Sequence, residues 1–95
     1  MATMYVSYLG GALQGVASTP IGSTTITTSG STAKTAVAAP AGARIVIVVS
    51  DAPHYVNVGP QATVTASAAN SIYVPANAER HIIIEPGSGV AAITA

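Results

Sequence analysis

The chain has 95 residues, of which 49% are hydrophobic and only 6% are charged, with three basic side chains, three acidic side chains and a formal net charge of zero. This length supports a single domain. Nucleic-acid binding needs clustered Lys and Arg, so the charge count excludes it, together with acidic tails and polybasic membrane patches. Cysteine is absent, which excludes disulfides and thiolate metal sites.

The chain is expected to fold without a membrane span. Disordered chains combine low hydrophobicity with high net charge, and this chain has neither. The longest aliphatic run, Ile45–Val49, is far shorter than a membrane helix. The first residues lack a basic region followed by an apolar one, so we expect no secretory signal and synthesis in the cytoplasm of a host cell.

The N-terminal part of the chain differs from the rest. Residues 4–9 could form a strand, but the glycines and the Ser-Thr-Pro sequence that follow are typical of irregular chain. We therefore predict an extended arm and linker over residues 1–22. The domain proper is then expected to cover residues 23–95.

From residue 23 onward, turn-forming residues recur about every eight to twelve residues, the spacing typical of an antiparallel sandwich or barrel. Residues between the turns alternate or are rich in β-branched side chains. The predicted strands cover residues 23–28, 33–38, 44–50, 55–58, 62–66, 71–74, 81–85 and 90–94. We predict an all-β fold, a small antiparallel β-sandwich of jelly-roll or Greek-key type with about seven or eight strands.

The segment 44–50 is the strongest predicted strand, and it is apolar on both faces. Ile45, Ile47 and Val49 lie on one face, and Val46 and Val48 on the other. A strand with two apolar faces needs a covering layer on each side. Either a loop of the same chain or a neighbouring molecule could supply the second layer.

Two similar turns precede two aliphatic strands. Pro40-Ala41-Gly42 comes before the strand at 44–50, and Pro75-Ala76-Asn77 comes before the strand at 81–85. Gly and Asn most readily adopt a positive φ, so both turns are expected to use one there. One short match does not establish a duplication.

Few residues are available for catalysis or metal binding. Ser50, Asp51 and His54 are the types found in a Ser-His-Asp triad, but Ser50 has no nucleophile elbow around it, which favours a polar loop. His54 and His81 could share a metal with Asp51 or Glu85 only by using nearly every ionisable group. The glycines at 10–15 lack the Lys-Ser/Thr of a phosphate-binding loop. We predict no catalytic residue, no cofactor and no metal.

The composition favours assembly. A core built from Val, Ile, Leu and Ala buries little area per residue, so a lone sandwich of this size is marginally stable. A near-zero charge and Ser/Thr-rich outer positions leave little to repel a neighbour. The four tyrosines suit interfaces at least as well as sugar stacking. The alternative is a modestly stable monomer in which a loop covers the second face.

From about Thr24 onward, roughly three quarters of the chain resembles small virion proteins of tailed bacteriophages. The resemblance is carried by the succession Ser-Thr-Ala-Lys-Thr-Ala-Val, Pro-Ala-Gly-Ala-Arg-Ile-Val-Ile-Val, Tyr-Val-Asn-Val-Gly, Ala-Thr-Val-Thr-Ala, Ile-Tyr-Val-Pro-Ala-Asn, Ile-Ile-Ile-Glu-Pro-Gly and Val-Ala-Ala-Ile. It rests on pattern and composition, and no functional residue is transferred by a motif.

The resemblance implies a non-enzymatic capsid decoration (cement) protein on the outer capsid surface. Its partners would be the major capsid protein and other copies of itself, with a trimer favoured, and it would stabilise the capsid by bridging neighbouring capsomers. The expected interface residues are Tyr5, Tyr8 and Leu9 in the arm, which could reach the capsid lattice, and Val46 and Val48 on the second face of the strong strand. The alternative is a receptor- or glycan-binding module of a phage fibre or tail.

Overall fold

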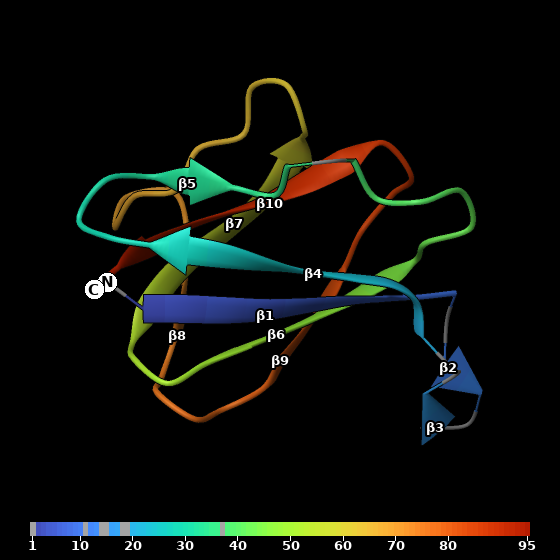
Figure 1. Cartoon of the computed structure of the whole chain (residues 1–95). Coiled ribbons are helices and arrows are strands. Elements are labelled where there is room, and N and C mark those ends of the chain that lie inside the picture. The colour runs from blue at the N-terminus through green and yellow to red at the C-terminus, as the bar shows by residue number, and fades with distance from the viewer. Residues whose placement is uncertain (1, 11, 14–15, 18–19, 37) are drawn as a thin grey trace.

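The structure, a computed structural model, describes residues 2–10, 12–13, 16–17, 20–36 and 38–95. Two antiparallel four-stranded sheets pack face to face in a small β-sandwich (Figure 1). Sheet 1 has the strand order β4-β1-β6-β9, and sheet 2 has the order β5-β10-β7-β8. The all-β sandwich predicted from the turn spacing is confirmed.

Sheet 1 lies in front in Figure 1, with its strands running from β4 at the top to β9 at the bottom. It contains β1 (Ala2–Leu9), β4 (Pro20–Thr28), β6 (Ile45–Ser50) and β9 (Arg80–Ile83). Sheet 2 contains β5 (Ala33–Lys34), β7 (His54–Pro60), β8 (Ile72–Val74) and β10 (Ser88–Thr94). A separate two-stranded hairpin, β2 (Ala12–Leu13) and β3 (Val16–Ala17), connects β1 to β4.

The core between the sheets is made of small aliphatic side chains. Alternate residues of each strand face inward, because successive side chains of a strand point to opposite sides. The fully buried apolar residues of this core include Met4, Val6, Val46, Val48, Val56, Val74, Val90 and Ala92. Close packing of aliphatic side chains, with Tyr8 as the one aromatic member of the described cluster, therefore holds the two sheets together.

The prediction of an arm over residues 1–22 is wrong for its first part. Residues 2–9 form β1, which lies inside sheet 1 and pairs with β4 on one side and β6 on the other. Met4, Val6 and Tyr8 point into the core, and Tyr5 alternates with them on the outer side. The alternating pattern was present in the sequence, but the glycines that follow it favoured the interpretation as a linker.

The predicted domain boundary is also displaced. β4 begins at Pro20, so a division between residues 22 and 23 falls inside a strand. The part of the predicted arm at positions 11, 14–15 and 18–19 lies outside the described residues. Position 37, within the predicted strand 33–38, does so as well, and the observed strand there is only Ala33–Lys34.

The predicted strand at 62–66 is not a strand. After a turn at 61–63, the chain lies across the outer face of sheet 2, where Val64 and Ala66 pack against Ala91 and Ile93. The alternation that suggested a strand therefore reflects packing onto a sheet face. Because its backbone does not pair with a neighbouring strand, the segment is not part of sheet 2.

The predicted turn chemistry is confirmed at both similar turns. Gly42 has φ 89° and Asn77 has φ 59°, and in each turn the N–H of the next residue donates to the carbonyl of the proline, at 3.1 Å and 3.3 Å. A third turn follows the same rule, with φ 87° at Gly87 and Ser88 N–H donating to the Glu85 carbonyl at 3.1 Å. A positive φ at the third position is the property of a type II turn.

Replacing Gly42 with Ala is expected to lower the free energy of unfolding by about 1–2 kcal/mol, because an L side chain in the left-handed region approaches its own carbonyl oxygen. Crowding is not the cause, since a Cβ at Gly42 has no other heavy atom within 4 Å. Gly30→Ala is the matched control: it has the same open surroundings but no positive φ. Urea denaturation measures both variants, and an equal loss in the two would contradict the turn assignment.

Candidate interaction surface

Part of the outer face of sheet 2 is covered by the chain itself. Residues 61–71, which we call the covering segment, lie over β5, β10 and β7 (Figure 1). Lys34 Nζ donates to the carbonyls of Gln61 and Ala62 at 2.8 Å and 3.0 Å, and Ala66 N–H donates to Thr32 Oγ1 at 2.9 Å. The only lysine of the chain is thereby used to hold this segment in place.

Two further contacts fix the covering segment against sheet 2. Asn57 Nδ2 on β7 donates to the Thr65 carbonyl at 2.9 Å, and Gln61 Nε2 donates to the Thr35 carbonyl at 2.8 Å. Gly89 on β10 permits the approach, because a Cβ there would lie 3.0 Å from the Gln61 Cα and 2.9 Å from its Cγ. The segment is therefore a built layer of the fold.

The outer face of sheet 1, which we call the open face, has no such layer among the described residues. The central strands contribute Tyr5, which is 57% exposed, and the half-buried Ile45, Ile47 and Val49. The edge strand β9 adds Ile83, which is 85% exposed. The register places these side chains in adjacent rows, with Tyr5 opposite Val49 and Ile45 opposite Ile83.

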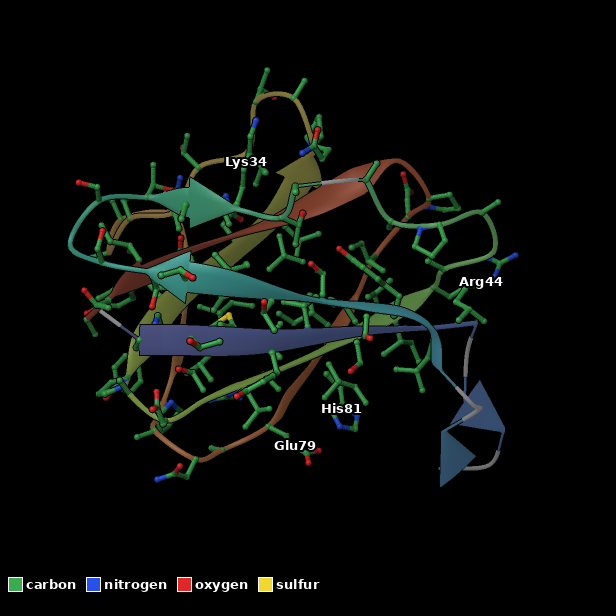
Figure 2. All side chains as sticks on the ribbon, in the orientation of Figure 1. Lys34, Arg44, Glu79 and His81 are labelled. Atoms are coloured by element: carbon green, nitrogen blue, oxygen red, sulfur yellow. The ribbon has the colours of Figure 1, made fainter. Side chains whose placement is uncertain are left out.

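The open face is also nearly free of charge. The outward positions on β1, β4 and β6 that are not buried are Thr, Ser, Tyr, Ile and Val, and the only Asp, Glu, His, Lys or Arg at an outward position of the four strands is His81 on β9. Lys34, Arg44, Glu79 and His81 lie around the periphery of the sandwich in Figure 2. An apolar surface with a Ser/Thr border is typical of a contact site, because single scattered apolar residues are ordinary but contiguous ones are not.

The five residues predicted as an interface separate into one exposed residue and four buried ones. Tyr5 lies exposed on the open face, and its role at an interface stays a prediction. The other four are at most 3% exposed inside the chain, so their side chains are not available to a partner: Tyr8, Leu9, Val46 and Val48. No arm carries them outward, because residues 2–9 form a strand of the sheet.

The two faces of β6 are reversed relative to the prediction. Val46 and Val48 pair with Tyr8 and Val6 of β1 and point into the core, whereas Ile45, Ile47 and Val49 form the outer side. When both faces of a strand are apolar, alternation alone does not say which one is inside. The residues that the sequence reasoning missed are therefore Ile45, Ile47 and Val49, together with Ile83.

Ser50, Asp51 and His54 do not form a triad. Ser50 Oγ donates to the Thr3 carbonyl at 3.0 Å, so this hydroxyl ties β6 to β1. Its contact with Asp51 Oδ1, at 3.5 Å, is long. His54 contacts neither of the two, and the three residues act as separate structural groups, as the polar-loop interpretation expects.

His54 is instead the centre of a buried polar network that joins the two sheets. Its side chain is 0% exposed, and Nδ1 donates to the Ala52 carbonyl at 2.7 Å. Nε2 then accepts from the Thr28 hydroxyl of β4, 2.5 Å away. The same hydroxyl lies 3.0 Å from the Ala2 carbonyl of β1, so one proton is shared between two acceptors.

The second histidine, His81, does not share a metal site with His54. His81 is exposed on β9, and its Nε2 lies 3.5 Å from Glu79 Oε2. This pair contributes little to stability because both side chains are solvated. The described part of the chain contains no group of three His, Asp or Glu side chains placed to hold a metal ion.

The buried hydroxyl of Tyr8 has no hydrogen-bond partner among the described residues. Burial raises the pKa of this hydroxyl, and the nearby Thr35 side chain lowers it in part without reaching hydrogen-bond geometry. The ring fills the core between β1 and β6, so its apolar area is its main contribution.

A second cluster of aromatic side chains lies on sheet 2. Tyr55 and Tyr73 are opposite each other on β7 and β8, with ring centroids 5.7 Å apart and an interplanar angle of 64°. Tyr73 is 47% exposed. The edge-to-face arrangement stabilises the β7–β8 pair but does not offer a flat two-ring platform.

Within the described ranges, the structure has no helix with the length and hydropathy that a membrane span requires. Comparisons of the chain with protein-family models, with curated proteins and with solved structures find no match. The geometry and composition therefore carry the functional argument.

Replacing Thr28 with Val is expected to lower the free energy of unfolding by about 1–3 kcal/mol, because the shape is kept while His54 Nε2 and the Ala2 carbonyl lose their common partner. Thr27→Val on the exposed side of the same strand is the control, with an expected change within about 0.5 kcal/mol. Chemical denaturation of both variants gives the comparison. Equal stability of the two would show that the buried network contributes nothing.

Proposed function

We propose that the chain is a non-enzymatic structural subunit of a tailed-phage virion, a capsid decoration protein that bridges neighbouring capsomers. The observation that carries this proposal is the contrast between the two outer faces of the sandwich. The covering segment packs on the outer face of sheet 2, while the open face presents Tyr5, Ile47 and Ile83 with no covering layer among the described residues. The resemblance of the sequence to small virion proteins supplies the biological setting.

The physical role follows from burial of apolar surface. A specific contact of standard size buries about 800 Å² on each partner, roughly a sixth of the 5083 Å² accessible to this chain. One sheet face and its margin suit such a contact. The major capsid protein is the proposed partner of the open face, and the added contact area would hold adjacent capsomers together against internal pressure.

The low charge of the chain supports this role in a second way. Subunits that decorate a shell sit close to one another, and like charges on adjacent copies would repel. With three basic and three acidic residues and a formal net charge of zero, this sandwich carries little net field. Copies can therefore be packed at high local density on an outer capsid surface, alone or as the trimers that the resemblance implies.

The exposed ring of Tyr73 favours one alternative, a receptor- or glycan-binding module of a fibre or tail, because a single aromatic ring can stack on a sugar even though Tyr55 and Tyr73 form no flat platform. Copy number separates the two functions. A decoration protein is present in hundreds of copies per particle and a fibre module in a few dozen at most, so quantitative mass spectrometry of purified virions distinguishes them.

Replacing Ile83 with Lys is expected to reduce occupancy on purified capsids by at least about tenfold, because it places a charge inside a desolvated contact. Ile72→Lys is the matched control, since Ile72 is also exposed but lies on sheet 2. Bound protein is measured by co-sedimentation, with urea denaturation confirming that both variants fold. Full occupancy of the Ile83 variant, or equal loss in both variants, would contradict binding through the open face.

A further inference from the structure

The four outer edges of the two sheets are not alike. β5 has two residues, one of them Lys34, and β8 has three residues. β9 has four residues and begins with Arg80 and His81. Short length and charged side chains are the usual devices that stop an edge strand from pairing with another chain. Three of the four edges are therefore protected.

The fourth edge, β4, carries neither device. It runs over nine residues, and none of them is charged. Ser23, Thr25 and Thr27 on its outer side are all exposed. None of the described backbone hydrogen bonds outside strand pairing involves residues 20–28, and β4 pairs only with β1. Its second edge therefore presents polar backbone groups that a strand partner would satisfy.

We propose that β4 pairs antiparallel with β4 of a second copy of this chain, joining two sheets 1 into one continuous eight-stranded sheet. At a two-fold contact, residues near the axis lie opposite residues of the same strand in the second copy. A charged side chain there therefore faces a like charge. Self-pairing through β5 or β9 would oppose the like charges of Lys34 or Arg80. β8 is also uncharged but has only three residues, so β4 is the one long edge that avoids this repulsion.

The register of this contact is constrained by the sheet itself. In an antiparallel pair, residues directly opposite each other point to the same face of the sheet. The inward and outward sides of the two β4 strands therefore match only if the two-fold axis passes through a residue position and not between two positions. Centring it on Thr25 pairs Ser23 with Thr27 and leaves Pro20, which has no N–H, outside the paired region. All outward pairs in this register are Ser or Thr, which form favourable cross-strand pairs.

The contact is independent of the proposed capsid role and compatible with it. The β4 edge and the open face are different surfaces of sheet 1. The edge points along the plane of the sheet, and the open face is perpendicular to it. Pairing through β4 therefore leaves Tyr5 and Ile83 available. A two-fold link of this kind can join two copies whether each is single or already part of a trimer.

The absence of cysteine in the native chain permits a direct test. In the proposed register the two Thr25 Cα atoms lie about 4.5–5.5 Å apart, within the range of a disulfide. The two Thr27 Cα atoms are offset by about four residues, roughly 13 Å along the strands. Under mild oxidation, Thr25→Cys is therefore expected to form covalent dimers at least about tenfold faster than Thr27→Cys.

Two further samples complete the test. A mixture of Ser23→Cys and Thr27→Cys proteins is expected to give the mixed dimer, since these positions are opposite each other. In sedimentation experiments at increasing concentration, Thr25→Lys is expected to abolish the dimer of the native chain, while His81→Lys on the β9 edge leaves it intact. Dimerisation that survives Thr25→Lys would assign the contact to another surface and overturn the proposal.

Equal crosslinking of the Thr25 and Thr27 variants would also overturn it, and so would a native chain that stays monomeric at every concentration. These outcomes are separate from failure of the capsid role. Crosslinking at Thr25 without capsid occupancy supports the β4 contact and removes the decoration function. Capsid occupancy without crosslinking at Thr25 supports the decoration function and removes the β4 contact.

Discussion

The structure depends on how the four faces of its two sheets are covered. Two faces cover each other across a core of small aliphatic side chains. The covering segment covers part of a third, where Lys34 holds it and where Val64 and Ala66 pack on sheet 2. The fourth, with Ile47 and Ile83, has no layer among the described residues.

The polar side chains inside the molecule also hold the sheets in place. Ser50 joins β6 to β1, and His54 with Thr28 joins β7 to β4 and β1. Both nitrogens of His54 have partners in the fold, and Ser50 Oγ donates to a backbone carbonyl. The side chains that would be considered first for catalysis therefore have structural partners, and Lys34, Arg44, Glu79 and His81 lie at the periphery (Figure 2).

The sequence was sufficient to predict the sandwich and its turns, because both depend on local chemistry. Positive φ at Gly42 and Asn77 follows from the residues themselves. The faces of β6 could not be predicted, since Ile47 and Val48 are equally apolar and only pairing with β1 decides which points inward. The role of residues 2–9 was missed although Met4 and Val6 alternate with polar neighbours, because membership of a central strand is a long-range property.

The central claim is that the open face is where this sandwich meets a larger assembly. A cryo-EM map of purified virions tests it most directly. The account predicts density for the β-sandwich at capsomer junctions on the outer shell, with β1, β6 and β9 turned toward the capsid and the covering segment facing solvent. Density in the opposite orientation, or confined to a tail or fibre, would contradict the claim.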